Sequence, residues 1–268
     1  DHPTTPSLVN LFKFKEAGIL KEFFFHNDKY VDVIITQLKR EDWQKRNKIK
    51  KWKKKLVAAL ACRNQGTRLY GKPIQNLDVK NGITILDNII SCLNSISCID
   101  EIVLGISEGS ENQIFKKIAD NNKLKYIIGD EEDVLSRLVK CGEVSSATDI
   151  FRVTSESPFL FFEPIEDLWK NHKKNKLDAT MYDQIIDGCG FEIISLKALI
   201  YSFNNGEDRH RSELCSLYIR ENLGLFKTFK PDIEKNLVRK DLRLTVDNPE
   251  DLVVCRAVFE KFKEAAPR

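Results

Sequence analysis

From Leu56 onward, short apolar runs alternate with segments of helical periodicity, and this alternation limits the chain to few folds. The apolar runs are rich in Ile and Val and end in polar residues. The segments between them, such as TILDNIISCLNSI and SENQIFKKIADNN, repeat apolar residues at helical spacing. Strands that alternate with helices of roughly 10–15 residues form βαβ units with parallel strands. We therefore predict an α/β fold with a mainly parallel sheet and helices on both faces.

The first apolar run leads directly into a cationic loop, in the sequence LVAALACRNQGTRLYGK of residues 56–72. Arg63, Arg68 and Lys72 supply three positive charges, and Gly66 and Gly71 separate them. Small residues let backbone N–H groups approach a ligand closely, and clustered cations suit a polyanion such as a triphosphate. The alternative is an ordinary surface loop, since such loops often carry Lys and Arg.

Carboxylates follow later strands of the predicted sheet. Asp130 and Asp133 come after the run KLKYIIG, and Glu156 comes shortly after TDIFRV. In open α/β sheets, ligands bind beyond the carboxyl ends of the strands. We therefore expect these carboxylates to converge with Arg63 at one edge of the sheet.

Five motifs occur in order along the chain: TRLYGK, IDEIVLGIS, IGDEEDVLSRL, FRVTSESPF and LRLTVDNPEDL. Their order and spacing resemble those of the spore-coat-polysaccharide-type cytidylyltransferases, which are relatives of the CMP-Kdo and CMP-sialic acid synthetases. The resemblance runs from about Leu56 to the C-terminus. It implies a three-layer, Rossmann-like nucleotidyltransferase that transfers CMP from CTP to an anionic sugar-like acceptor, releasing pyrophosphate, for surface-glycan or related conjugate biosynthesis. It also implies Mg²⁺ as cofactor and a homodimer. The seven cysteines, which lack CxxC spacing, indicate a cytoplasmic enzyme.

Two other kinds of function stay open at this point. One is a nucleotidyltransferase with another base preference, or one that acts on a phosphonate or an alditol phosphate. The other is a degenerate nucleotide-binding or scaffold module without turnover, which departures from the family pattern at Gln65 and Glu156 suggest.

The family's loop pattern, Ala-Arg-x-Gly-Ser-x-Arg-x-x-x-Lys, is matched at its three cations, whereas Gln65 replaces the glycine and Gly66 the serine. A side chain at a position that needs unusual φ and ψ costs about 1 kcal/mol or more. We therefore expect Gln65 to shift the loop, and the backbone at Gly66 to make the close approach to the ligand instead. The resemblance makes Arg63, Arg68 and Lys72 catalytic, because they neutralise charge on the leaving pyrophosphate. The implied nucleotide-binding residues are Ala61, Cys62, Arg63, Gly66, Arg68, Lys72, Gly129 and Asp133.

Two carboxylates are candidate magnesium ligands by the same resemblance. Glu156 stands in TSESP, where relatives carry Asp, and Asp247 stands in the turn of LTVDNPEDL. Glu156 still offers a hard oxygen, although its extra methylene moves the metal or recruits a bridging water. Read locally, Glu156 is alternatively an exposed strand-end carboxylate and Asp247 a helix N-cap or turn residue. Asp251 is a further candidate ligand.

The segments DQIIDGCGFEIISLKAL and DRHRSELCSLYIREN correspond to the part of the family that holds the acceptor and contributes to a dimer contact. The pattern is weakened here, with Gly190 in place of an Asp. Arg211 suits a bidentate grip on an acidic acceptor, whereas His210 is expected to be a structural hydrogen-bond donor. Asp133 could alternatively form a surface ion pair with Arg137, one helical turn away. The candidate acceptor-binding residues are Glu192, Arg211 and Glu213.

Residues 1–55 differ from the rest of the chain in charge, with fourteen Lys and Arg against seven Asp and Glu. We predict an appendage at residues 1–55 and a nucleotidyltransferase domain at 56–268. The appendage reads as an amphipathic helix over residues 7–25 and a strand over residues 29–40. The basic run of residues 45–55 favours a solvated linker helix over a nucleic-acid or membrane site, because Trp52 is its only aromatic residue. The segment is an added subdomain or the tail of a neighbouring domain in a longer parent protein.

The overall composition agrees with a soluble enzyme. The chain has 268 residues, of which 42% are hydrophobic, which is enough for one sizeable core. No stretch approaches the roughly 20 apolar residues of a transmembrane helix, and no signal peptide is apparent. The seven cysteines lack CxxC spacing and are expected to be reduced thiols.

Overall fold

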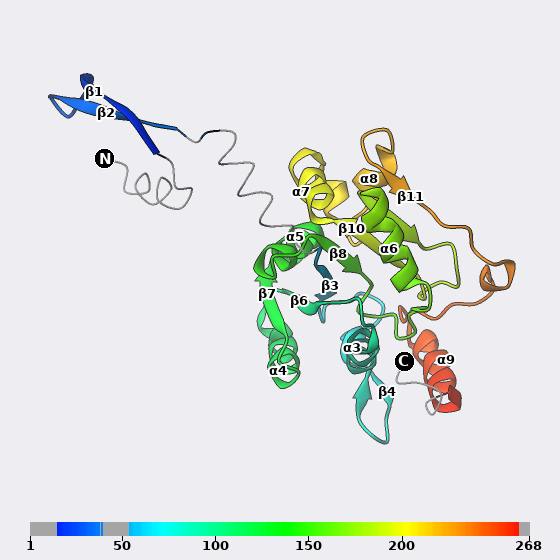
Figure 1. The fold of residues 1–268 in the computed structure, drawn as a ribbon. Coiled ribbons are helices and arrows are strands. Elements are labelled where there is room, and N and C mark those ends of the chain that lie inside the picture. The colour runs from blue at the N-terminus through cyan, green and yellow to red at the C-terminus, as the bar shows by residue number, and fades with distance from the viewer. Residues whose placement is uncertain (1–14, 38, 40–53, 263–268) are drawn as a thin grey trace. The chain divides into compact units, whose positions relative to one another are not determined.

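The computed structural model describes residues 15–37, 39 and 54–262 (Figure 1). The chain divides into two compact units, Asp1–Lys53 and Lys54–Arg268, which we call unit 1 and unit 2. The boundary predicted between residues 55 and 56 lies close to this division.

Unit 1 contains a hairpin in which β1 (Lys15–His26) pairs antiparallel with β2 (Lys29–Gln37). Asn27 and Asp28 join the strands with φ of 49° and 59°, the sign that a tight hairpin turn requires. The strand predicted over residues 29–40 is confirmed over residues 29–37, where β2 runs, whereas residues 38 and 40 lie outside the described residues. The helix predicted over residues 7–25 is wrong from Lys15 onward, because aromatic residues near the turn favour β structure and the turn pairs the segment with β2. Residues 7–14 lie outside the described residues.

The basic run predicted as a linker helix also lies outside the described residues as far as residue 53. Its last two members belong to unit 2 and form ion pairs there. Lys54 contacts Asp149 at 2.9 Å, and Lys55 contacts Glu101 at 2.6 Å. These two lysines therefore hold the start of unit 2 in place.

Seven strands form the central sheet of unit 2. They are β3 (Leu56–Cys62), β6 (Glu101–Ser107), β7 (Lys125–Gly129), β8 (Asp149–Arg152), β9 (Ala179–Tyr182), β10 (Phe191–Ser195) and β11 (Thr228–Phe229). Their order is β11-β9-β10-β8-β3-β6-β7. All neighbouring strands are parallel, except that β10 runs antiparallel to both β8 and β9. The prediction of a mainly parallel sheet is confirmed.

Helices cover both faces of this sheet (Figure 1). They are α3 (Ile85–Ser95), α4 (Gln113–Asn121), α5 (Val134–Val144), α6 (Ile165–Asn175), α7 (Leu196–Asn205), α8 (Leu217–Glu221) and α9 (Pro249–Phe262). Leu56 and Leu60 of β3 join the core formed with α3, α4, α6 and α9, whereas Val57 and Ala59 join the core formed with α5 and α7. The period-two alternation of strand side chains thus produces the three predicted layers. None of the helices in the described part of the chain is long and apolar enough to span a bilayer.

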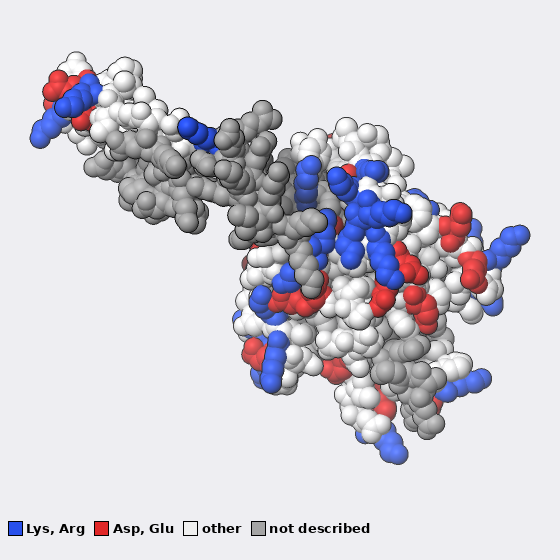
Figure 2. All heavy atoms as spheres, viewed as in Figure 1, with Lys and Arg blue, Asp and Glu red and all other residues white. Residues whose placement is uncertain are grey.

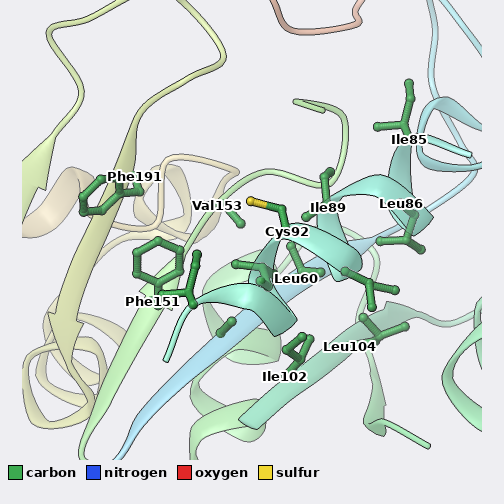
Figure 3. Packing of buried hydrophobic residues seen from close by; sticks show 14 of the residues in the cluster. Leu60, Ile85, Leu86, Ile89, Cys92, Ile102, Leu104, Phe151, Val153 and Phe191 are labelled. Carbon is green, nitrogen blue, oxygen red and sulfur yellow. The ribbon is translucent and has the colours of Figure 1, made fainter. Parts of the chain in front are cut away.

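The helix α3 shows how local sequence places one of these layers. A two-residue strand, β5 (Ile83–Thr84), pairs with β4 (Asn76–Asp78) just before it. The Asp87 N–H donates to the Thr84 hydroxyl, and the Asp87 carboxylate accepts from the Thr84 N–H, so a capping box starts the helix. Its apolar side chains pack on Leu60 and Leu104 of the sheet (Figure 3). The helices predicted over residues 84–96 and 110–122 are confirmed as α3 and α4.

Charges of both signs lie on the visible face of unit 2, and basic side chains gather over α6 (Figure 2). The first turn of α6 carries Glu166 and Asp167, and its last turn carries Lys173 and Lys174. This distribution complements the helix dipole. The seven cysteines are free thiols, and all but Cys98 are buried.

Candidate active site

The loop after β3 is held by hydrogen bonds that set the positions of its cations. The Gly71 N–H donates to the Asn64 carbonyl at 2.8 Å, and the Asn64 N–H donates to Oδ1 of Asn112 at 2.8 Å. Gly71 has a φ of 61°, which glycine adopts without strain. A Cβ added at Gly66 would lie 2.3 Å from the carbonyl oxygen of Leu69. Gly66 therefore allows the loop backbone to turn tightly on itself.

Gln65 is accommodated in this loop without a positive φ. Its side-chain amide donates to Glu111, and its Oε1 accepts from Nδ2 of Asn112 at 3.1 Å. The prediction of backbone strain at Gln65 is wrong, because the tight turns of the loop lie at Gly66 and Gly71 instead. Gln65 fastens the loop to the segment that follows β6.

The cationic loop forms one wall of a cleft at the carboxyl ends of β3 and β8, which we call the first cleft. The N-terminal part of α5 and the segment after β8 form its other walls. The structure thus brings together residues that are far apart in the chain. The predicted site residues that line the first cleft are Ala61, Arg63, Gly66, Arg68, Lys72, Glu156 and Glu213.

A second cleft adjoins the first and shares Arg68, Glu156 and Glu213 with it. It extends over β10 and the segment before α9, where Glu192 and Asp247 line it. Because the two clefts have walls in common, a ligand in one can contact a ligand in the other.

Asp247 lies among cations at the boundary of the clefts. Its Oδ1 is 2.6 Å from Nζ of Lys72 and 3.1 Å from a guanidinium nitrogen of Arg68, and Arg243 contacts its other oxygen. Burial favours a higher pKa for Asp247, but the hydrogen bond from Lys72 and the three positive charges outweigh it and lower the pKa. Asp247 is therefore an anion in a cationic setting. The N–H groups of Asp247 and Asn248 donate to Asp251 at 2.9 and 2.8 Å.

Asp251 therefore holds this turn, and it lines neither cleft. The turn itself is tied to the segment after β8. The Val246 N–H donates to the Glu156 carbonyl at 3.0 Å, and the Ser157 hydroxyl donates to that of Thr245 at 3.0 Å. These bonds place Glu156 and Asp247 on one wall of the second cleft.

Glu156 has little compensation for its charge. Burial raises its pKa, and the charges of Glu213 and Asp247 raise it further, against the lowering effect of Lys72 and Arg152. Among the described residues, its carboxylate accepts one hydrogen bond, a long one of 3.4 Å from the Ser155 hydroxyl. It is thus not the exposed strand-end carboxylate that local sequence allowed.

These two carboxylates fit a magnesium ion that arrives with a polyphosphate. Mg²⁺ is commonly held by one or two carboxylates together with substrate phosphates, and hard oxygen donors suit it. Glu156 has an oxygen available, and Asp247 lies on the same wall of the cleft. No cluster of three His, Cys, Asp or Glu suited to a metal occurs among the described residues, so a nucleotide would have to complete the coordination.

A buried network of charges forms the floor of the second cleft. Glu192 is 2% exposed and accepts from Arg152 at 2.9 Å, from Arg220 at 2.5 Å and from the Ser216 hydroxyl at 2.5 Å. Burial would raise the pKa of Glu192, but Arg152 and Arg220 hold it below its usual value. Arg152 also donates to the Glu213 carbonyl at 2.6 Å. Glu192 thereby orients two arginines toward the cleft.

The comparison with known sequences identifies what kind of protein carries these clefts. A family model described as cytidylyltransferase matches residues 58–265. The chain belongs to the cytidylyltransferase family. The predicted family is confirmed, and with it a CTP-dependent nucleotidyltransferase.

One known sequence and two solved structures are similar to this chain. The spore coat polysaccharide biosynthesis protein SpsF of Bacillus subtilis is 24% identical over 216 residues, which cover 78% of this chain and 88% of that protein. A cytidylyltransferase from Leptospira borgpetersenii serovar Hardjo-bovis has a similar structure, with a TM-score of 0.67 and 20% identity over 79% of this chain and 96% of that one. CMP:2-keto-3-deoxy-manno-octonic acid synthetase, solved with CTP, gives a TM-score of 0.59 and 14% identity over 77% and 99%. The two solved structures show the shared fold.

Four of the predicted site residues of this cytidylyltransferase do not line either cleft: Cys62, Gly129, Asp133 and Arg211. Asp133 caps α5 by accepting from the Ser136 N–H at 2.8 Å, and it pairs with Arg211. Arg211 also lies over the ring of Phe203 at 4.4 Å. Cys62 and Gly129 are buried.

Two further residues considered in the sequence, His210 and Arg137, are buried. His210 is buried and is a structural hydrogen-bond donor, as expected: its Nε2 donates to the Glu221 carboxylate at 2.9 Å, while its Nδ1 accepts from the Glu207 N–H at 2.8 Å. The surface pair considered for Asp133 and Arg137 is absent, because Arg137 is buried and Asp133 pairs with Arg211 instead.

Three arginines that line the second cleft of the cytidylyltransferase were not predicted from the sequence: Arg152, Arg220 and Arg243. Arg152 stands at the end of a strand, which was a usable signal. Arg220 lies on a short helix and Arg243 in an irregular segment, and there sequence periodicity gives no direction for a side chain. Their convergence depends on tertiary structure.

Proposed function

We propose that this cytidylyltransferase transfers CMP from CTP to an anionic sugar-like acceptor, with release of pyrophosphate, for surface-glycan or related conjugate synthesis. The observation that carries the proposal is the continuity of the two clefts. The first is lined by Arg63, Arg68 and Lys72, which suit a triphosphate, and the second is lined by arginines that suit an acidic acceptor. Glu156 lies where the clefts meet.

The chain's own residues account for much of the chemistry. In the proposed reaction an acceptor oxygen forms a bond to the α-phosphorus of CTP while the bond to the pyrophosphate oxygen breaks. Arg63, Arg68 and Lys72 neutralise the negative charge that builds on the departing pyrophosphate. No protein nucleophile is required, so catalysis consists of positioning and electrostatic stabilisation.

Glu156 and Asp247 would hold Mg²⁺ at the junction of the clefts. When bound, Mg²⁺ polarises a phosphoryl oxygen and lowers the pKa of an attacking hydroxyl. The cations around Asp247 keep this carboxylate ionised, as a metal ligand must be. Entry of a triphosphate would draw Lys72 and Arg68 toward the phosphates and free an Asp247 oxygen.

The second cleft supports an acidic acceptor. Arg152, Arg220 and Arg243 line it, and Glu192 holds the first two in place. Guanidinium groups bind carboxylates and phosphates through paired N–H donors. Asp183 and Asp187 line the same cleft and can accept from sugar hydroxyls. A sugar acid or sugar phosphate matches this mixture of donors and acceptors.

The experiment is a pyrophosphate-release assay with each of four nucleoside triphosphates, with and without Mg²⁺, against a panel of 2-keto sugar acids and sugar phosphates. We expect release only with CTP, Mg²⁺ and an acidic acceptor. Arg243→Lys should raise the KM of the acceptor, whereas Arg256→Lys, outside both clefts, serves as the matched control. Transfer to neutral sugars at an equal rate would overturn the acceptor class, and CTP binding without any release would favour a binding module.

A further inference from the structure

Arg137 is a buried arginine in the wall of the first cleft, and the reaction above assigns it no part. Its side chain is 1% exposed. It passes two glycines: a Cβ at Gly129 would lie 2.8 Å from its Cγ, and one at Gly105 would lie 3.4 Å from its Cβ. Gly105 belongs to β6 and Gly129 to β7, so both strands leave room for this side chain. The space is built for an arginine.

The charge of Arg137 is not balanced by a carboxylate among the described residues. Its guanidinium donates to three backbone carbonyls, those of Gly105 at 3.0 Å, Glu131 at 3.3 Å and Cys62 at 3.4 Å. Burial lowers its pKa, and the charge of Arg63 adds to this effect. Arginine nevertheless stays protonated in proteins, so burying this cation on folding costs free energy. A ligand with oxygen or nitrogen acceptors would offset that cost.

One donor of Arg137 has no partner. Within the described part of the chain, two buried side-chain nitrogen or oxygen atoms lack a hydrogen-bond partner, Nε of Arg137 and Oδ1 of Asn64. Both residues line the first cleft. Buried polar groups are rarely left unsatisfied, and an exception calls for an explanation such as a functional role. The two exceptions coincide with the cleft in which a nucleotide would bind.

Arg137 lies at the end of the first cleft that suits a base. Val134 and Leu138 of α5 line the cleft beside it and give this end apolar walls. The cations Arg68 and Lys72 contact Asp247, which lines the second cleft, so the phosphate end lies on that other side. A nucleoside triphosphate bound with its phosphates at the cations would direct its base toward α5.

We propose that Arg137 reads the base of the bound nucleotide by donating from Nε to the acceptor edge of cytosine. The inference rests on the proposed binding of CTP in the first cleft. Cytosine presents two adjacent acceptors, O2 and N3, whereas N3 of uracil carries a hydrogen. An arginine donor is attracted to the first edge and opposed by the N3–H of the second. Arg137 is thereby a specificity-determining residue that favours CTP over UTP.

The test compares binding of CTP and UTP, measured by calorimetry with Mg²⁺ present, in the native protein and in Arg137→Lys and Arg137→Met. Arg137→Lys keeps the charge, so it remains informative if Arg137→Met does not fold. We expect the preference for CTP to fall by roughly tenfold to hundredfold, as for loss of one specific polar contact. Arg256→Lys, whose arginine also donates to a backbone carbonyl but lies outside both clefts, should keep the native preference.

A melting temperature without nucleotide separates this role from a purely structural one. If Arg137 is purely structural, Arg137→Lys should have a much lower melting temperature and an unchanged ratio of CTP to UTP affinity. That result would overturn the inference. A native protein that binds CTP and UTP equally overturns it as well, while leaving nucleotidyl transfer intact. If the native protein binds neither nucleotide, the proposed function fails first and the inference fails with it.

Discussion

Lys72 and Asp247 form an ion pair of 2.6 Å at the meeting point of the two clefts, although 175 residues separate them in the chain. About a fifth of each side chain is exposed, so solvent screens the pair only in part. The pair joins a cation of the loop after β3 to a candidate metal ligand before α9. A triphosphate that recruits Lys72 would therefore also change the surroundings of Asp247, so nucleotide binding would be coupled to the proposed metal binding.

Replacing Lys72 by alanine should lower the rate of pyrophosphate release by about 10²–10³-fold, because one charge-stabilising donor is lost from the leaving group. The measurement is kcat at saturating CTP and acceptor. Lys170→Ala is the control, since Lys170 forms an exposed pair with Asp167 on α6. A native rate in Lys72→Ala would exclude this lysine from leaving-group stabilisation.

Glu192→Ala should destabilise the fold by about 3–5 kcal/mol, because it leaves the guanidinium of Arg152 without its carboxylate partner and removes one carboxylate from Arg220. Arg152 and Arg220 both pair with Glu192, whose side chain is 2% exposed. Urea-induced unfolding gives the free energy directly. Asp241→Ala, which removes an exposed partner of Arg239, should leave the free energy of unfolding almost unchanged. Equal effects of the two substitutions would contradict a buried network.

Gly66→Ala should weaken CTP binding while leaving the core intact. The new Cβ would lie 2.3 Å from the Leu69 carbonyl oxygen, so the loop backbone must move. Strain of about 1–3 kcal/mol corresponds to about a tenfold to hundredfold rise in the Kd of CTP. Gly224→Ala meets no atom within 4 Å and should bind CTP as the native protein does. Native affinity in Gly66→Ala would mean that the loop adapts freely.

The layers and the cationic loop could be predicted because both are local features of sequence. Alternation along β3 places Leu60 and Ala59 on opposite faces, and this requires no knowledge of the remaining chain. The same holds for the capping box of Thr84 and Asp87, which marks the start of α3.

The acceptor side was harder to predict because it depends on how strands pair. Arg152 meets Glu192 only because β10 runs antiparallel to β8, with these two residues opposite each other in the ladder. The spacing of Arg137 to Asp133 predicts a surface ion pair, whereas Gly105 of β6 and Gly129 of β7 leave room for Arg137 in the interior. The spacing of two residues on one helix does not show whether a neighbouring strand leaves space for their side chains.

Glu156→Gln should stabilise the protein in the absence of ligand at neutral pH. Burial and the charges of Glu213 and Asp247 raise the pKa of Glu156 above its ordinary value of 4.5, so the folded state favours the protonated form. The stability that this preference contributes is fully present below the ordinary pKa and is lost as pH rises through the raised pKa. Gln resembles the protonated form and avoids that loss. We therefore expect a higher melting temperature for the variant near pH 7, and a difference that shrinks as the pH falls toward about 4.

Adding CTP with Mg²⁺ should reverse the order of stability, because saturating ligand stabilises the native protein by a few kcal/mol and the variant has lost a metal ligand. Melting curves across this pH range, with and without CTP and Mg²⁺, measure both effects on the same samples. A variant that is less stable than the native protein at neutral pH would show that the Glu156 charge is compensated in the fold. A variant that gains as much from CTP and Mg²⁺ as the native protein would remove Glu156 from the metal site.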